Sequence, residues 1–364
     1  MISAYIKLSN FCNMGCSHCY LPESVRGNQT MMEDQTFNET LKHIKELCDT
    51  QLDNEVLILW HGGEPLQFDK KVFEKRLVQA ENYFFSHGIK ASHGMQTALI
   101  NFDEEWGRII KRYFNSSIGV SVDPASRSIN GDTIRYDSVL TKRIKLAQEM
   151  GINISGNVCP SVSDIGNEGS LLDWFSNHNI SGFSIDRYNS FGEGIDPNRP
   201  SNKEHSLFLR NLLEASLERI KDGKRVAVCS TLVSAIGGVL NGDSGDRWGV
   251  TCLEDYIVVN PDGVTNTCPD KISEESTYTD GNGFVNSDKR IQAISNHKLL
   301  HPKDHCYSCE YFNWCKSGCP ITINSWELEG ECSGYSRFLN HVKLLLNKEE
   351  KVIRYYFSGE HEER

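Results

Sequence analysis

Short apolar runs alternate with longer amphipathic segments through the first 222 residues. The apolar runs predict six strands, near residues 3–8, 55–60, 92–97, 117–122, 152–158 and 181–187. The amphipathic segments predict six helices, near residues 33–50, 69–87, 103–114, 136–150, 168–178 and 203–222. Strands that alternate with helices are typical of parallel sheets with helical crossovers, so we expect an α/β fold for residues 1–222.

The pattern changes after residue 223, where segments shorten and Gly, Asp, Asn and Ser accumulate. Such a stretch builds little apolar core and relies on metal ligation for order. We therefore predict a linking region over 223–251 and a cysteine-rich domain over 252–345. The charged residues 346–364 are expected to form a solvated tail.

Charge and hydropathy narrow the class of protein. Among 364 residues, 38 Lys and Arg oppose 49 Asp and Glu, for a net charge of −11, which disfavours nucleic-acid binding. No stretch approaches the roughly 20 apolar residues of a membrane helix, and the N-terminus lacks a secretion signal. We expect a cytoplasmic protein with neither nucleic-acid nor membrane partners.

Cysteine dominates the candidate chemistry. The chain has 13 cysteines, and in a reducing cytosol clustered thiols indicate metal binding or catalysis rather than disulfides. They form an N-terminal group (Cys12, Cys16 and Cys19) and a C-terminal group (Cys252, Cys268, Cys306, Cys309, Cys315, Cys319 and Cys332). The isolated Cys48, Cys159 and Cys229 are expected to be small buried apolar residues.

The N-terminal group places three thiols within eight residues, directly after the first predicted strand. Three thiolates on one loop can hold three corners of a 4Fe-4S cluster and leave one iron open to a ligand. A zinc knuckle with a distant fourth ligand is the alternative.

The Cys-x3-Cys-x2-Cys spacing is accompanied by Trp60-His-Gly-Gly-Glu-Pro65 after the second strand and Ser121-Val-Asp123 after the fourth. Together these motifs resemble the radical S-adenosylmethionine (radical SAM) superfamily. The resemblance implies a partial (β/α)6 TIM-like barrel with a cluster and S-adenosylmethionine at the carboxyl ends of its strands, where a 5′-deoxyadenosyl radical is made. The cofactor-binding residues that it implies are His18, Gly62, Gly63, Glu64, Pro65, Ser121 and Arg135. Ala98 stands where an Asn is usual in the family, so no ligand role is assigned to it.

The seven C-terminal thiols exceed one tetrahedral site, so at least two metal centres are implied; a pair of zinc ribbons is one interpretation. Their spacing resembles the SPASM extension of radical SAM enzymes, which implies two auxiliary 4Fe-4S clusters. By resemblance, Cys252, Cys268 and Cys319 bind the first, and Cys306, Cys309, Cys315 and Cys332 bind the second. The first lacks one ligand, leaving three alternatives: Asp246, Cys229 or an open iron.

The resemblance implies a maturase that abstracts hydrogen from a ribosomally made precursor peptide or a protein and installs a carbon–carbon or thioether crosslink. Asp123 and Asp186 are candidate bases, Arg187 could bind a substrate carboxyl, and residues 191–194 are expected beside them. Because the first strand starts at residue 3, we expect leader recognition by a separate protein or by direct contact, and electrons from a flavodoxin or ferredoxin. The alternatives are oxidation of a sulfatase Cys or Ser to formylglycine, and a non-catalytic iron–sulfur or zinc scaffold.

Overall fold

The chain packs as two compact units in the computed structural model. The first contains Met1–Ser155 and Cys252–Ala293, and the second contains Gly156–Ser190, Asp196–Thr251 and Ile294–Arg364. The residues that the structure describes are 1–123, 126–129, 131–188, 197–254, 256–266, 268–269, 277–278, 292, 294–300, 302–322 and 326–359. These compact units reflect how the chain packs. The predicted domain boundaries after residues 222 and 251 instead follow composition and the positions of the cysteines, and they stay a prediction.

The first unit is built on a sheet with the strand order β10-β9-β8-β1-β2-β3-β4. Its strands are β1 Ile2–Lys7, β2 Glu55–His61, β3 Lys90–Thr97, β4 Ser117–Ser121, β8 Tyr256–Val259, β9 Thr265–Asn266 and β10 Thr277–Tyr278. Strands β1 to β4 are parallel to their neighbours, and β8 pairs in parallel with the other edge of β1. The β1–β8 pairing joins a strand of the cysteine-rich region to the first strand of the chain.

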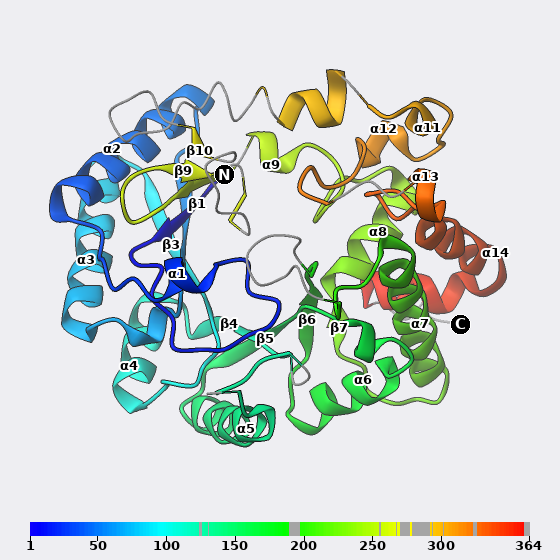
Figure 1. The fold of residues 1–364 in the computed structure, drawn as a ribbon, viewed down its shortest axis with the longest axis horizontal. Coiled ribbons are helices and arrows are strands. Elements are labelled where there is room, and N and C mark those ends of the chain that lie inside the picture. Colours follow the sequence, from blue (N-terminus) through cyan, green and yellow to red (C-terminus); the bar gives the residue numbers. More distant parts are fainter. Residues whose placement is uncertain are drawn as a thin grey trace. The chain divides into compact units, whose positions relative to one another are not determined.

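Helices of the first unit pack beside these strands (Figure 1). Their bounds are α1 Glu23–Arg26, α2 Asp34–Gln51, η1 Pro65–Gln67, α3 Lys70–Ser86, α4 Glu104–Tyr113 and α5 Thr133–Glu149; the short α9 is Thr251–Glu254. Aspartates begin three of them, because the carboxylates of Asp69, Asp103 and Asp132 each accept a backbone N–H of the first turn. The cap at Asp132 explains why α5 starts three residues before its predicted beginning.

Buried aromatic rings fill the space between α3 and the sheet. Phe73 packs edge-on against Trp60 and Trp106, with ring centroids 5.1 and 5.4 Å apart. The Trp60 indole donates a hydrogen bond of 3.1 Å to Nδ1 of the buried His93. Nδ1 of His93 must therefore carry no proton if it is to accept the hydrogen bond from Trp60.

Acidification is expected to destabilise the first unit through His93. Burial lowers the pKa of His93 from 6.5 to about 4. The folded state thus favours the neutral ring, so stability is full above pH 6.5 and is lost as the pH falls toward 4. The full loss is about 3 kcal/mol, of which about 1 kcal/mol is lost by pH 5.5. Urea unfolding at pH 7.5 and 5.5 should show a smaller pH effect in His93→Gln; an equal effect in both proteins would contradict this.

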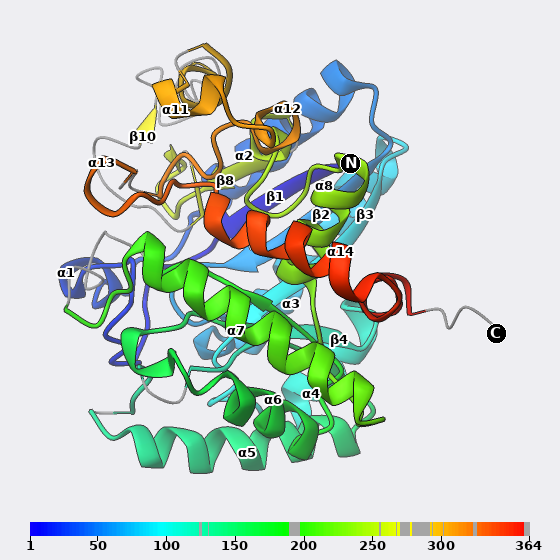
Figure 2. The same cartoon turned by 90° about the vertical axis from the view of Figure 1, so that its right-hand side faces the viewer.

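The second unit contains the end of β5 and strands β6 and β7, all parallel. The bounds of its elements are β5 Asn153–Val158, η2 Val162–Asp164, α6 Glu168–Asn177, β6 Gly182–Ile185, α7 Asn202–Lys221, β7 Val228–Cys229, α8 Ser230–Asn241, a π-helix at Asn296–Leu300, α11 Asp304–Tyr307, α12 Phe312–Cys315, α13 Trp326–Glu329 and α14 Ser336–Ser358. Helix α14 lies beside α7 and contacts α8 (Figure 2).

The predicted α/β class is confirmed, and the six predicted strands and six predicted helices correspond to β1–β6 and to α2–α7. The expected solvated tail is wrong over its first part: α14 continues to Ser358 and buries Ile353 and Tyr356, because an apolar stripe runs between its charges. The isolated Cys48, Cys159 and Cys229 are buried, as predicted. None of the helices in the described ranges is both long and apolar enough to cross a membrane.

Candidate functional site

The N-terminal cysteine loop is joined at its start to the segment that follows β2. Backbone N–H groups of Gly63 and Glu64 donate to the carbonyls of Ser9 and Phe11, at 3.1 and 3.0 Å. A Cβ on Gly63 would lie 1.9 Å from the Phe11 oxygen, and one on Gly62, whose φ is +128°, would lie 2.2 Å from the Ser9 oxygen. The glycines are therefore required for the close approach of the cysteine loop itself.

Residues that follow β4 hold the other part of the loop. The N–H groups of Gly15 and Ser17 donate to the carbonyls of Ser128 and Ser126, both at 3.1 Å. The Ser128 hydroxyl donates back to the Gly15 carbonyl at 3.0 Å. The loop between Cys12 and Cys19 is thus held from both sides by backbone hydrogen bonds.

The donor set of this loop suits an iron–sulfur cluster. Burial raises the pKa of Cys12 and of Cys16, and the charges of neighbouring thiolates raise it further, which shows that the three thiols share one electrostatic environment. Binding to iron removes this cost because the metal stabilises the deprotonated sulfur. Among the described residues, no three His, Cys, Asp or Glu side chains converge on a single-ion site.

Glu64 is buried at the end of β2 with 2% of its surface exposed. Its carboxylate accepts from the Thr97 hydroxyl, from the Ala98 N–H at 2.8 Å and from the Leu66 N–H at 3.0 Å. Burial raises the pKa of Glu64, and these hydrogen bonds oppose the shift. The backbone of Ala98 therefore takes part in the site although its side chain carries no ligand. Contact of Glu64 with S-adenosylmethionine stays a prediction.

The strand ends β3 and β4 bring polar groups together. The Gln96 amide donates to the Ser121 hydroxyl at 2.9 Å, and the Tyr136 hydroxyl donates to the Ser121 carbonyl at 2.8 Å. Asp123 is buried, and its carboxylate lies 3.7 Å from Nε2 of the buried His18. Asp123 thus lies close to His18, which belongs to the cysteine loop, while the roles assigned to Ser121, Asp123 and His18 stay predictions.

Two other residues assigned to the cofactor lie differently. Pro65 is buried and begins the 3-10 turn η1, where its fixed φ suits the first position. Arg135 is exposed in the first turn of α5, and its backbone N–H donates to the capping Asp132. The structure does not bring the Arg135 side chain into the buried group formed by His18 and Asp123.

The sequence reasoning missed two cations beside this loop. Nη1 of Arg127 donates to the Cys16 sulfur at 3.6 Å, while its Nε donates to Asp123. The fully buried Lys7 ammonium donates to the Pro269 carbonyl at 2.6 Å, next to Cys268, and lies 4.6 Å from the centre of the Tyr20 ring. The sequence signal for Lys7 was its position between Ile6 and Leu8 at the end of an apolar strand. Arg127 offered no such signal, because it lies in a segment without hydrophobic periodicity.

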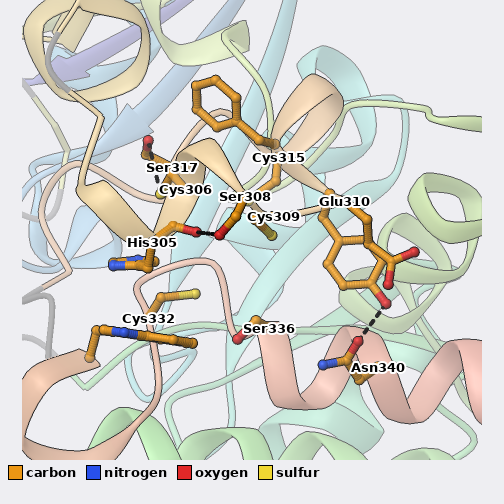
Figure 3. A pocket seen from close by; sticks show the side chains of 13 residues that line it. His305, Cys306, Ser308, Cys309, Glu310, Cys315, Ser317, Cys332, Ser336 and Asn340 are labelled. Atoms are coloured by element: carbon orange, nitrogen blue, oxygen red, sulfur yellow. Dashed lines mark hydrogen bonds between the residues drawn. The ribbon is translucent and has the colours of Figure 1, made fainter.

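Four thiols of the C-terminal group line one cavity of about 260 Å³ within the second unit (Figure 3). These are Cys306 on α11, Cys309 after it, Cys315 at the end of α12 and Cys332 before α14. They are the four that the resemblance to the SPASM extension implied as ligands of one cluster. The structure therefore brings this set to one place, and four soft donors around a cavity fit a 4Fe-4S cluster.

Small and charged residues shape this cavity. A Cβ on Gly334 would lie 2.6 Å from the Cys315 sulfur, so the chain there must be glycine or move. The buried Lys298 ammonium donates to the Gly318 carbonyl at 2.7 Å and lowers the pKa of Cys315, which burial raises. The buried Glu331 carboxylate accepts from the Cys332 N–H at 2.9 Å and from the Ser206 hydroxyl at 2.6 Å. One buried cation and one buried anion thus lie beside the four thiols.

The first auxiliary set is divided between the compact units, since Cys252 and Cys268 belong to the first and Cys319 to the second. Within the second unit, burial lowers the pKa of Arg187, but the charges of Cys319, Asp186 and Asp246 together raise it by more. Nε of the buried Arg247 lies 3.6 Å from the carboxylate of Asp246. Residues 191–194 lie outside the described residues. The first set and the roles of Asp186 and Arg187 stay predictions.

A family model described as the radical SAM superfamily matches residues 6–160. This stretch contains the N-terminal cysteine loop, the Gly-Gly-Glu-Pro turn and the Ser-Val-Asp strand end. Residues 6–160 therefore match a radical SAM domain, and the resemblance that the motifs predicted is confirmed for this part of the chain. Such a domain implies a 4Fe-4S cluster and S-adenosylmethionine, which the three thiols of the loop fit.

Curated and solved relatives extend the likeness to nearly the whole chain. The "Cysteine-type anaerobic sulfatase-maturating enzyme" of Clostridium perfringens strain 13 is 22% identical over 372 residues, covering 94% of this chain and 96% of the relative. The structure "Native anSMEcpe with bound AdoMet and Cp18Cys peptide" has a TM-score of 0.76 and 18% identity, covering 98% of this chain and 99% of that one. Streptococcus suis SuiB bound to precursor peptide SuiA has a TM-score of 0.62 and 16% identity, covering 87% and 71%. These structures show a shared fold.

Proposed function

We propose that this enzyme modifies a ribosomally made peptide by radical chemistry and installs a carbon–carbon or thioether crosslink. The observation that carries the proposal is the cavity lined by Cys306, Cys309, Cys315 and Cys332, because an additional cluster is useful to an enzyme that must accept an electron from its substrate. Support for a peptide substrate comes from the two solved relatives, whose structures hold peptides.

The residues of the two cysteine sites and of the strand ends would have different roles in this reaction. Cys12, Cys16 and Cys19 would hold a 4Fe-4S cluster, which would supply one electron for cleavage of S-adenosylmethionine to methionine and a 5′-deoxyadenosyl radical. That radical would take a hydrogen atom from the peptide. Glu64, held by Thr97 and Ala98, would orient the cofactor amine, and the glycines before it keep the loop in place. Asp123 or Asp186 would accept the proton that is released as the new bond forms, and an auxiliary cluster would accept the electron from the substrate radical.

We further propose three 4Fe-4S clusters, with the first auxiliary cluster lacking a fourth cysteine. Asp246 stands at that position and is 28% exposed, with its charge opposed by Arg247. Cys229 is fully buried, burial raises the pKa of its thiol, and its backbone N–H donates to the Tyr356 hydroxyl. This arrangement favours Asp246 or an open iron over Cys229. A separate leader-binding protein and a flavodoxin or ferredoxin donor complete the proposal.

Formylglycine formation is the second candidate. It is favoured by the near-complete coverage of a cysteine-type sulfatase-maturating relative. Both reactions begin with hydrogen abstraction from a side chain, and they diverge only when the substrate radical reacts. The C-terminal group has seven cysteines, and Asp246 stands at the position where an eighth would be expected. This difference favours crosslinking.

Iron analysis tests the proposal directly. The chain, purified and reconstituted without oxygen, is expected to hold about twelve irons, and about eight after Cys12, Cys16 and Cys19 are changed to Ala. Only the wild type should release 5′-deoxyadenosine from S-adenosylmethionine under strong reductant. Zinc in place of iron at every site, or no release of 5′-deoxyadenosine by the wild type, would contradict the radical mechanism.

Mass spectrometry then separates the two candidate reactions. A thioether crosslink retains the substrate sulfur, whereas conversion of Cys to formylglycine loses it and creates an aldehyde that a hydrazine reagent captures. The precursor peptide expected here is one encoded beside the enzyme, and a sulfatase-derived Cys or Ser peptide is the matched alternative. Aldehyde formation on the sulfatase peptide alone would favour the second candidate.

A further inference from the structure

Among the residues that the structure describes, Arg127 is a cation whose side chain contacts a thiol of the N-terminal loop directly. Its Nη1 donates to the Cys16 sulfur at 3.6 Å, and the guanidinium side chain is 16% exposed. Asp123, 2% exposed, accepts from Arg127 Nε on the opposite side. The contact therefore connects a carboxylate at the end of β4 to a sulfur atom through one guanidinium.

The backbone holds Arg127 in this position. Its own N–H donates to the Asp123 carbonyl at 2.9 Å, and its neighbours Ser126 and Ser128 are hydrogen-bonded to the cysteine loop on either side of Cys16. Because the flanking residues are paired to the loop, the backbone of Arg127 is held beside Cys16, and the hydrogen bond from Nε to Asp123 orients the guanidinium toward the sulfur. The arrangement is consistent with a fixed electrostatic role rather than a mobile surface ion pair.

We propose that Arg127 is a positioning residue that raises the reduction potential of the cluster bound by Cys12, Cys16 and Cys19, and that Asp123 moderates this effect. The inference rests on the proposed function, which places a cluster on these thiols. Reduction adds one negative charge to a cluster, and a nearby cation stabilises that charge, more strongly in a site of low dielectric constant. The Asp123 carboxylate, bound to the same guanidinium, opposes the gain.

The consequence for the reaction is a cluster that a biological donor can reduce more readily. Arg127 does not need to touch S-adenosylmethionine for this, since it acts through the Cys16 sulfur. A purely structural role, as partner of Asp123, would change stability and cluster loading but would leave the potential of the loaded cluster unchanged. The potential is therefore the readout that separates the two roles.

The experiment is a redox titration of the reconstituted holoenzyme, followed by electron paramagnetic resonance. The signal that changes on addition of S-adenosylmethionine reports the N-terminal cluster, and its absence from the Cys12, Cys16 and Cys19 triple variant confirms the assignment. At a fixed applied potential, Arg127→Met is expected to lower the ratio of reduced to oxidised cluster about tenfold, which equals 59 mV for one electron. Arg127→Lys should shift it less, because it keeps the charge but loses the planar fork.

Asp123→Asn provides a test of opposite sign. Removing the opposing carboxylate should raise the reduced fraction, which a loss of folding cannot imitate. Arg112→Met is the matched control, since Arg112 is an arginine of the same unit whose side chain is 71% exposed. It should leave the potential unchanged.

Iron counts on each variant keep the outcomes distinct. An Arg127→Met protein with full iron and an unchanged potential would overturn the inference and leave the proposed function intact. The same holds if Asp123→Asn and Arg127→Met shift the potential in the same direction. A wild-type chain without iron on the N-terminal loop would overturn the proposed function and this inference with it.

Discussion

Replacing Gly63 with alanine is expected to remove the iron bound by the N-terminal loop, about four atoms per chain, and with it all 5′-deoxyadenosine formation. The added Cβ would lie 1.9 Å from the Phe11 carbonyl oxygen and 2.5 Å from that of Asn10. These are backbone atoms of the cysteine loop, so the loop itself must move away from Glu64. Overpacking of this kind costs about 1–3 kcal/mol, and here the displaced segment carries the three thiols.

Gly169→Ala is the matched control for this prediction. Gly169 lies in α6, and an added Cβ meets no atom within 4 Å. The change should leave iron and activity intact and stabilise the fold by up to about 1 kcal/mol. Iron content per folded chain and circular dichroism measure both variants. A Gly63→Ala protein that keeps full iron would show that the loop does not depend on this close approach.

Replacing Cys332 with alanine is expected to remove about four irons from the second unit and to leave 5′-deoxyadenosine formation in place. Cys332 is one of four thiols around a single cavity, and the N–H of this residue donates to the buried Glu331. Without its thiolate the cluster loses one of four corners. Peptide modification should stop while cleavage of S-adenosylmethionine continues, because the two depend on different clusters.

Cys48→Ala is the control for Cys332, since Cys48 is fully buried in α2 and belongs to neither cysteine group. It should cost stability through a small cavity and leave the iron count unchanged. Measuring iron and zinc per chain in both variants tests this prediction. Two zinc ions in place of iron in the second unit would remove the auxiliary cluster from the mechanism.

The strands and crossover helices of residues 1–222 could be predicted because their periodicity is local and strong. Helices α8 and α14 could not, for two different reasons. Helix α8, Ser230–Asn241, follows a change in composition that suggested a linker, and its apolar residues become informative only beside α14. The charges of α14 suggested solvation, whereas burial of Ile353 and Tyr356 depends on that tertiary contact.

The candidate site shows the same division. The resemblance to the SPASM extension implied which four C-terminal cysteines bind one cluster, and the structure places these four around one cavity. The contacts of Arg127 and Lys7 depend on which backbone segments approach the loop, and no spacing rule encodes such approaches. Likewise, the motif suggested that Gly62 and Gly63 serve a cofactor, and the structure adds that they admit the carbonyls of Ser9 and Phe11.

The pairing of β8 with β1 bears on how the protein is made. Strand β1 leaves the ribosome before β2 and pairs with it within about sixty residues, whereas its other edge pairs with Tyr256–Val259 much later in the chain. Contacts of such long sequence separation form late, and an unpaired edge invites association with other chains in the meantime. The segment that precedes the three N-terminal thiols thus completes its pairing only after Val259 has been synthesised. Insertion of iron into the finished site is therefore expected only after β8 has been made.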